Sequence, residues 1–190
     1  MQSVAESLHA LAEREPLPED WRQDVREGLE LIAERCEALD RFIGAYSRLM
    51  HLPPPQPSSL EVPALLRRVA GLEGRMEIAV VDGPEVRILG DRDQLEQLLI
   101  NVLSNAVEAS LQVHPTGGGQ VSLGWHVNAE TVEIHMEDDG PGLTAEGDAF
   151  IPFYTTKERG SGIGLTLSRQ IAEAHGGSLT LEDREDEGGF

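Results

Sequence analysis

Gly160, Gly162 and Gly164 stand at alternate positions directly before "LTLSRQIAEAHGG", a stretch with helical spacing of its apolar residues. Small residues let backbone N–H groups approach an anion, and a helix N-terminus carries partial positive charge. The loop therefore suits a phosphate. It is not a P-loop, because Leu165 stands where that design needs a lysine, and the polar "TTKERG" replaces the strand that precedes a dinucleotide fingerprint. By itself the loop is also typical of a simple turn.

A second group of polar residues lies in the helix predicted over residues 91–112. Asn101, Asn105 and Glu108 are spaced i, i+4 and i+7, so they share one face, while the leucines and valines between them supply a buried side. Aligned polar side chains on an otherwise apolar helix need partners. For the helix alone, a solvated stripe explains the pattern equally well.

A third group is "DDGPG" at residues 138–142, directly after the predicted strand "TVEIHME". A carboxylate at the end of a strand, beside a glycine turn, can accept a hydrogen bond from an amino group such as that of adenine. The segment alone predicts no more than a turn.

The combination is more specific than its parts. An Asn-bearing helix, then Asp-x-Gly-x-Gly, then "FIPFYTTK", then Gly-x-Gly-x-Gly resembles the N, G1, F and G2 boxes of the histidine-kinase ATP-binding domain, over roughly residues 60–188. The fold is shared with gyrase-type topoisomerases, a heat-shock chaperone and a mismatch-repair ATPase. "NAVEA" and "PFYTTK" are most similar to the nitrogen-regulation branch of sensor kinases.

The resemblance implies ATP and Mg²⁺ as cofactors and gives each motif a role. Asn105 would ligate Mg²⁺, for which an amide oxygen is a suitable hard ligand, and Asn101 would hold the triphosphate or its water shell. Asp138 would accept from the adenine amine, and Lys157 would offer a cation to a phosphate. Phe150 and Phe153 would anchor the loop that closes over the nucleotide, whereas the role of Glu108 stays open. The implied cofactor-binding residues are Asn101, Asn105, Asp138, Gly140, Gly142, Thr156, Lys157, Gly160, Gly162, Gly164 and Leu165, of which Asn101, Asn105 and Lys157 are the implied catalytic residues.

Asn101 favours one reaction among those of the related folds. The ATPases named above place a glutamate at this position to activate water, and an amide cannot take a proton at neutral pH. The expected reaction is therefore transfer of the γ-phosphoryl to a protein nucleophile. The alternatives are an ATPase of another branch, a serine kinase of the same fold, and a degenerate module that dimerises and holds nucleotide without kinase activity.

The family's phosphoacceptor histidine is not found among the six histidines. The acceptor motif has an acidic residue directly after the histidine, but Ala10 follows His9. Since "QSVAESLHAL" resembles the part of the first dimerisation helix just after that motif, we expect the sequence to begin downstream of the acceptor.

Two segments precede the ATP-binding region. Apolar residues from Trp21 to Met50 alternate in steps of four and three, which predicts a coiled-coil seam, and with a shorter helix before Pro16 they form a helical hairpin. Such a hairpin is expected to pair with a second copy in a four-helix bundle, and the alternative is that it packs on its own domain. The expected domains are a partial dimerisation hairpin at 1–52, a proline-rich linker at 53–59 and an ATP-binding catalytic domain at 60–190. After the linker, the patterns predict a helix over 60–72, short strands "MEIAVV" and "VRILG", the helix over 91–112, a hairpin of "QVSLGWHV" and "TVEIHME", a helix from about 161 to 175 and a last strand "SLTLED". This mixed order of helices and strands predicts an α+β fold, a two-layer sandwich with a mixed sheet and helices on one face.

Composition limits the partners. With 34 acidic and 15 basic residues, the net charge of −19 argues against nucleic acid or an anionic membrane as a partner. The lone Cys36 is expected in an apolar core. We expect a cytoplasmic chain whose full-length protein could be anchored through upstream segments, and the resemblance implies a homodimer and a response-regulator receiver domain as partners.

Overall fold

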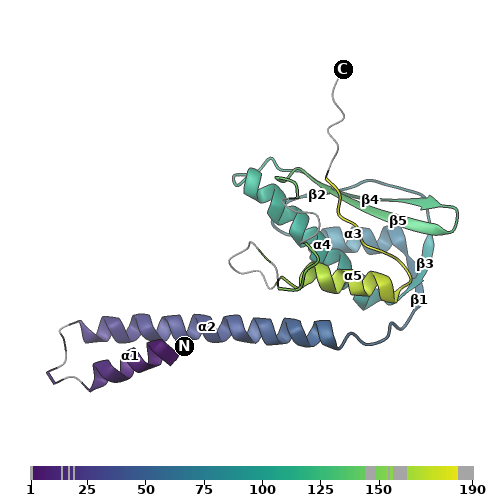
Figure 1. The fold of residues 1–190 in the computed structure, drawn as a ribbon. Helices are drawn as coiled ribbons and strands as arrows, with labels where there is room; N and C mark the ends of the chain where they lie inside the picture. The colour runs from purple at the N-terminus through teal and green to yellow at the C-terminus, as the bar shows by residue number, and fades with distance from the viewer. Residues whose placement is uncertain are drawn as a thin grey trace.

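The computed structural model describes residues 2–13, 15–16, 18, 20–143, 149–153, 155 and 162–183. Its elements fall into a helical hairpin and an α+β domain, which Figure 1 shows one above the other. No helix within the described ranges is both long and apolar enough to cross a membrane.

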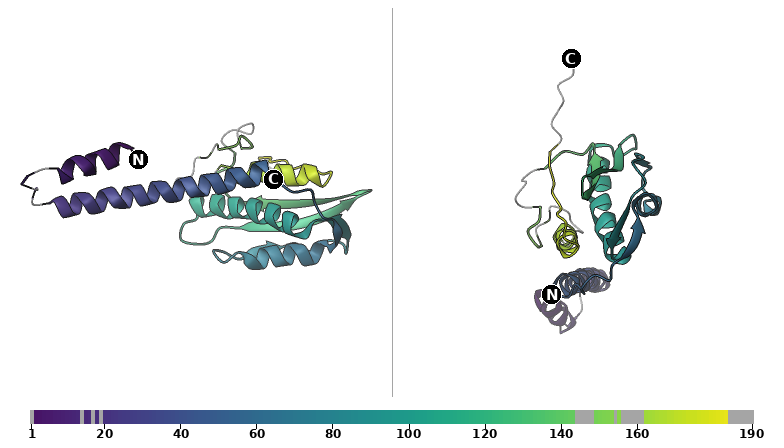
Figure 2. Two further views of the ribbon diagram at one scale, coloured as in Figure 1. Left: turned by 90° about the horizontal axis from the view of Figure 1, so that it is seen from below. Right: turned by 90° about the vertical axis from the view of Figure 1, so that its right-hand side faces the viewer.

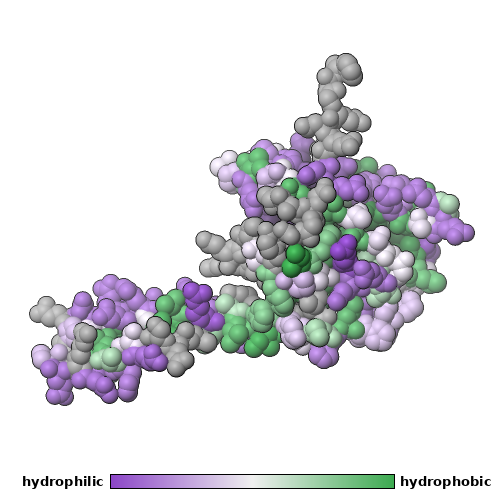
Figure 3. Space-filling model, viewed as in Figure 1, coloured by the Kyte–Doolittle hydropathy of each residue, from purple (hydrophilic) through white to green (hydrophobic). Residues whose placement is uncertain are grey.

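Helices α1 (Gln2–Ala12) and α2 (Trp21–Met50) form the hairpin. Gly28 allows the close approach, since a Cβ there would lie 2.8 Å from the side chain of Leu8. The shorter α1 covers only part of α2, as Figure 1 shows, so much of the predicted seam is exposed in the single chain. The expectation that Cys36 is buried is wrong for this reason. The large exposed apolar residues of α2 are Leu29, Leu31, Leu39, Phe42, Ile43, Tyr46 and Met50, and Figure 3 shows apolar surface where the C-terminal part of α2 meets the domain.

The domain has the predicted two layers. Strand β2 (Ile78–Val80) pairs in parallel with β4 (Val121–Asn128), and β4 pairs antiparallel with β5 (Thr131–Asp138). A separate antiparallel ladder joins β1 (Ser58–Glu61) to β3 (Arg87–Gly90). Helices α3 (Val62–Leu72), α4 (Arg92–Val113) and α5 (Gly164–Ala174) lie on one side of the strands, as the end-on view in Figure 2 shows. The predicted mixed sheet with helices on one face is confirmed.

Two segments differ from the prediction. Strand β1 was not predicted, because "SSLE" has weak strand character and its pairing partner, β3, is far away in the sequence. Residues 178–183, "SLTLED", were predicted as a strand but are not in one. A strand needs a ladder partner, and the sequence offers this segment no neighbouring hairpin strand.

The core fills the space between the sheet and helices α3 and α4. Trp125 of β4 is buried there, and its indole N–H donates to the Pro84 carbonyl at 2.8 Å. A second, smaller cluster packs α5 onto α4. The buried core residues are Val62, Leu65, Leu66, Val69, Leu99, Leu103, Ala106, Val107, Val121, Leu123 and Trp125 in the main cluster, and Ile163, Leu167 and Ile171 in the smaller one.

The ends of α4 and α5 are fixed by side chains. The Asp91 carboxylate caps α4 by accepting from the backbone N–H groups of Asp93 and Gln94, and it also accepts from Gln56 N at 2.8 Å. These donors, Gln56 first, hold the pKa of Asp91 below its usual range. His175, at the end of α5, accepts from Asp91 N at 3.0 Å through Nε2 while its Nδ1 lies 2.8 Å from the Ile171 carbonyl. Both ring nitrogens of His175 thus contact backbone groups, so this histidine has a structural role.

Candidate nucleotide-binding site

The predicted polar face of α4 meets the start of α5. The buried leucines of α4 face the sheet, so the opposite face, with the half-buried Asn101 and Asn105, turns toward α5 and the loop before it. The Asn101 side-chain N–H₂ lies 3.4 Å from both the Gly164 carbonyl and the Ser168 hydroxyl. Ser168 is fully buried, and its hydroxyl lies 3.4 Å from the Leu98 carbonyl. These contacts place Asn101 next to Gly164, the last of the three glycines in the predicted loop.

The end of β5 packs closely against the C-terminal half of the same helix. Asp138 accepts a hydrogen bond from Gly140 N at 2.9 Å. A Cβ on Gly140 would lie 2.6 Å from Ala109 Cβ and 2.9 Å from the Ala109 carbonyl carbon, so only glycine allows this approach. Burial, together with the negative charge of Asp139, raises the pKa of Asp138 above its usual range. A half-buried carboxylate thus stands beside α4 near Asn105, where it can accept a hydrogen bond from a ligand.

Asp139 has a different role, which the sequence did not suggest. Its carboxylate accepts from the buried Ser110 hydroxyl at 2.5 Å and from Gln120 N at 2.9 Å, and it lies 3.1 Å from His114 Nε2. The Ser110 hydroxyl contributes most to holding the pKa of Asp139 below its usual range. The feature of the sequence that could have indicated this role is Ser110, because it is a polar residue on the apolar side of α4. Asp139 ties the end of β5 to α4 and thereby fixes Asp138.

The loop before α5 is held at both ends. Phe153 N donates to the Gly162 carbonyl at 2.8 Å, and Gly162 has a φ of +64°, which glycine adopts without strain. The Thr166 hydroxyl donates to the Phe150 carbonyl at 3.0 Å, and the Arg169 guanidinium lies 4.1 Å from the centre of the Phe150 ring.

Some predicted residues of this region cannot be compared with the prediction. Thr156, Lys157 and Gly160 lie outside the described residues. Leu165 is half-buried in the first turn of α5, which begins at Gly164, three residues later than predicted. Gly142 has a φ of +80° and a Cβ there would lie 3.0 Å from an Asp183 carboxylate oxygen, so the turn after β5 requires glycine.

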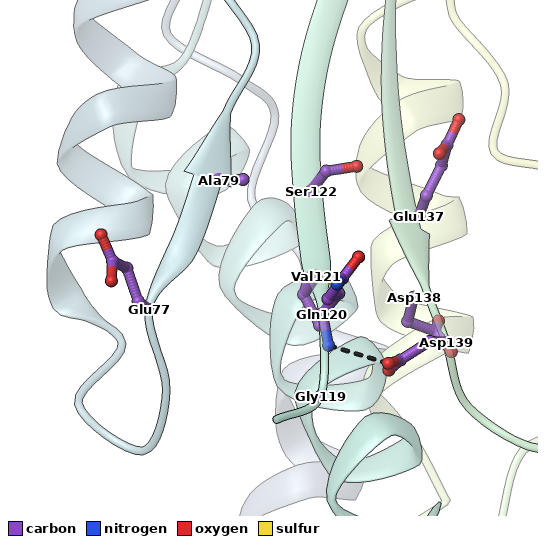
Figure 4. A pocket seen from close by; sticks show the side chains of 9 residues that line it. All are labelled: Glu77, Ala79, Gly119, Gln120, Val121, Ser122, Glu137, Asp138 and Asp139. Atoms are coloured by element: carbon purple, nitrogen blue, oxygen red, sulfur yellow. Dashed lines mark hydrogen bonds between the residues drawn. The ribbon is translucent and has the colours of Figure 1, made fainter. Parts of the chain in front are cut away.

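A pocket of about 410 Å³ lies on the opposite face of the sheet (Figure 4). Ala79, Ser122 and Glu137 line it from three neighbouring strands, pointing away from the helices, and Glu77 lines it from the position directly before β2. Asp138 and Asp139 lie at its edge. Its carboxylates would repel a polyphosphate, so this pocket is poorly suited to a nucleotide.

The residues present fit a magnesium nucleotide. Gly140 lets the end of β5 pack closely against α4, which places a carboxylate suited to an amino group beside this helix. The Asn101 amide nitrogen faces two acceptors, so its oxygen is the atom suited to a ligand or a water. Among the described residues, no cluster of three or more His, Cys, Asp or Glu side chains could hold a metal. Amide oxygens such as those of Asn101 and Asn105 are hard ligands that suit a magnesium ion which keeps phosphate and water oxygens.

Comparison with known proteins agrees with this geometry. Residues 90–190, just over half of the chain, match the model of the histidine kinase-, DNA gyrase B- and HSP90-like ATPase family. The chain belongs to this ATPase family. The matched segment begins just before α4 and contains all the predicted site residues, and the family implies ATP as the ligand.

Curated relatives point to sensor kinases within this ATPase family. The C4-dicarboxylate transport sensor protein DctB of Rhizobium meliloti is 32% identical over 82% of this chain, and the nitrogen regulation protein NtrY of Azorhizobium caulinodans is 31% identical over 76% of it. The chain spans only 26% and 20% of the lengths of these two relatives.

Solved structures agree. The nucleotide-free catalytic domain of histidine kinase ThkA matches with a TM-score of 0.60 and 28% identity, covering 69% of this chain and 90% of that one. ThkA in complex with the response regulator TrrA matches 97% of this chain and 54% of that one with a TM-score of 0.62, and at 20% identity it supports the fold alone. The resemblance to the histidine-kinase ATP-binding domain is confirmed, with the family match covering residues 90–190.

Proposed function

We propose that the chain is the catalytic region of a sensor histidine kinase, which binds Mg²⁺-ATP and transfers the γ-phosphoryl to a histidine that precedes residue 1. The contact that carries this proposal is the one between Asn101 and Gly164. It joins the Asn-bearing helix to the glycine loop, while the same helix, at Ala109, touches the Asp138–Gly140 turn.

The side-chain chemistry of α4 favours phosphoryl transfer over hydrolysis. Asn101 stands where water-activating ATPases of this fold have a glutamate, and an amide cannot act as a general base at neutral pH. Transfer needs positioning and charge neutralisation rather than a base acting on water. The donor of the phosphoryl group would therefore be held by this chain, and the nucleophile would come from a separate segment.

Each residue of the site has a proposed task. Asp138 would accept from the adenine amine, and Asn105 would coordinate Mg²⁺, which when bound neutralises phosphate charge. Asn101 would hold the triphosphate or its water shell. Thr156, Lys157, Gly160, Gly162, Gly164 and Leu165 would surround the phosphates from the loop and the start of α5.

We also propose a domain arrangement and partners. Residues 1–52 would form part of the dimerisation hairpin, 53–59 the linker and 60–190 the catalytic domain. The exposed apolar residues of α2 support pairing with a second copy, since a seam of this kind is normally covered in a bundle. An aspartate on a response-regulator receiver domain would receive the phosphoryl group from the histidine, and the likeness to NtrY supports a place in the nitrogen-regulation branch.

The first test is calorimetric titration with a non-hydrolysable ATP analogue, with and without Mg²⁺. We expect magnesium-dependent binding, and Asn105→Ala should abolish it without changing the circular dichroism spectrum. Asn128→Ala, at the exposed C-terminal end of β4, is the matched control and should bind as the wild type does. Unchanged affinity in Asn105→Ala would remove the assignment of this site, and no binding by the wild type would favour the degenerate module. In the full-length protein, radiolabelled γ-phosphate should appear on a histidine upstream of residue 1.

A further inference from the structure

Arg75, in the loop between α3 and β2, is held by a neighbouring carboxylate. Its side chain donates to both oxygens of Glu73, through Nε at 2.9 Å and Nη2 at 2.7 Å, and its backbone N–H donates to the same group at 2.7 Å. The Glu73 side chain is only 8% exposed. Its hydrogen bonds with Arg75 hold the pKa of Glu73 below its usual range. A two-pronged pair of this kind fixes the orientation of the guanidinium.

The same guanidinium reaches across to α4. Its Nη2 donates to the Ser104 hydroxyl at 3.1 Å, and its Nη1 lies 3.5 Å from Glu108 Oε1. The Ser104 hydroxyl in turn donates to Glu108 Oε1 at 3.2 Å. In each of these contacts a donor faces an acceptor, so Arg75 links the loop before β2 to the Glu108 carboxylate on α4.

Glu108 lies on the face of α4 where the nucleotide is proposed to bind. It follows Asn105 by three residues, which places it about one helical turn along the same face. A carboxylate here would repel the phosphates of a bound nucleotide, in a chain whose net charge is already −19. Without a counter-charge, this position would oppose the ligand that the face is built to hold.

We propose that Arg75 is a positioning residue of the nucleotide site, which acts through Glu108: it neutralises this carboxylate and holds it against Ser104, so that the face carrying Asn101 and Asn105 can accept a polyphosphate. This inference rests on the proposed function. It explains how an acidic residue can occupy a position beside the magnesium ligand.

The surface ion pair of Arg67 and Asp82 serves as a comparison for the contacts of Arg75. Arg67 and Asp82 lie 2.7 Å apart, but their side chains are 54% and 76% exposed, and this pair makes no described contact with α4. Pairs of this kind contribute little to stability. Arg67 therefore supplies a matched control: the same residue type, also paired with a carboxylate, in the same half of the domain.

The test compares ligands that differ only in their phosphates. Calorimetry would measure binding of the Mg²⁺ complex of a non-hydrolysable ATP analogue, and of adenosine, to the wild type and to Arg75→Gln, Arg75→Lys, Arg67→Gln and the double variant Arg75→Gln/Glu108→Gln. We expect Arg75→Gln to weaken the triphosphate about tenfold, the effect of one uncompensated charge at about 1.4 kcal/mol. Adenosine should be affected less than about twofold, within 0.4 kcal/mol.

The double variant separates charge from structure. Glu73 loses its arginine partner in Arg75→Gln and in the double variant, so any structural damage is present in both. Removing the Glu108 charge in the double variant should nevertheless restore the triphosphate affinity to near the wild-type value. Arg75→Lys, which keeps the charge, should retain most of that affinity, and Arg67→Gln should match the wild type.

Three results would overturn the proposal. If Arg75→Gln weakens the binding of adenosine and of the triphosphate equally, the role of Arg75 is structural. If the double variant binds the triphosphate as weakly as Arg75→Gln does, the arginine contacts phosphate itself. If Arg75→Gln leaves the triphosphate affinity unchanged, the contact between Arg75 and Glu108 has no effect on the nucleotide site. If the wild type binds no nucleotide, the proposed function fails instead.

Discussion

Gly140→Ala tests the closest contact of the candidate site. The added Cβ would lie 2.6 Å from Ala109 Cβ and 2.9 Å from the Ala109 carbonyl carbon. Carbon atoms normally approach to about 3.5–4.0 Å, so the new methyl would be roughly 1 Å too close to the helix. Because one of these atoms is helix backbone, no change of rotamer relieves the overlap, and α4 and the end of β5 must separate.

The cost follows from this geometry. Overpacking typically costs about 1–3 kcal/mol, and an unrelieved backbone contact belongs in the upper half of that range, at about 2 kcal/mol. For a urea dependence of about 2 kcal/mol per molar, the unfolding midpoint should fall by roughly 1 M. The fluorescence of the buried Trp125 can report the transition in a Trp21→Phe background.

A control glycine makes the reasoning refutable. A Cβ on Gly71, near the C-terminal end of α3, would meet nothing within 4 Å, so Gly71→Ala should stabilise the domain by about 0.5–1 kcal/mol. If Gly140→Ala unfolds at the wild-type midpoint, the close packing of β5 against α4 is wrong. A second readout is ligand binding, since the same Cβ would lie 2.6 Å from Asp138 Oδ1 and should displace the carboxylate that we propose to bind adenine.

Two further substitutions separate the adjacent carboxylates. Because burial and the charge of Asp139 raise the pKa of Asp138, its ionised form destabilises the folded state, and this penalty appears as the pH rises through the raised pKa. Asp138→Asn should therefore raise the urea midpoint of unfolding at pH 7 and have little effect on it near pH 3. It should also weaken the binding of adenine nucleotides more than that of guanine nucleotides. An equal loss of affinity for both would mean that the carboxylate only stabilises the turn. Ser110→Ala removes a buried hydroxyl that donates to Asp139 and should cost about 1.5–3 kcal/mol in denaturant unfolding. A cost below about 0.5 kcal/mol would mean that Gln120 and His114 hold Asp139 without the serine.

Much of the fold was predictable because local signals agreed. The helix over 92–113 differs by one residue at each end from the predicted 91–112, since Asp91 gives it a cap and its apolar spacing is regular. The β4–β5 hairpin was likewise predicted within one residue at each end, because both strands are rich in β-branched and apolar residues. The contact of Asn101 with Gly164 agrees with the order of motifs quoted from the sequence.

The features that the sequence did not predict depend on distant partners. Strand β1 pairs with β3 across α3, and no periodicity in its four residues signals this. The link from Arg75 to Glu108 spans 33 residues and joins a loop to a helix, so no spacing rule could suggest it. The role of Asp139 was hidden because "DDGPG" also predicts an ordinary turn, and only the fold brings Ser110 and His114 to it.

The separation of the core into two clusters has a consequence for local unfolding. Helix α5 is attached through the small cluster of Ile163, Leu167 and Ile171, apart from the main core that α3, α4 and the sheet share. Such a unit can open while the rest of the domain stays folded, so its amide hydrogens should exchange with solvent sooner than those in the middle of α4. A nucleotide held between α4 and α5 would join the two units, and part of its binding free energy would be used to suppress that opening.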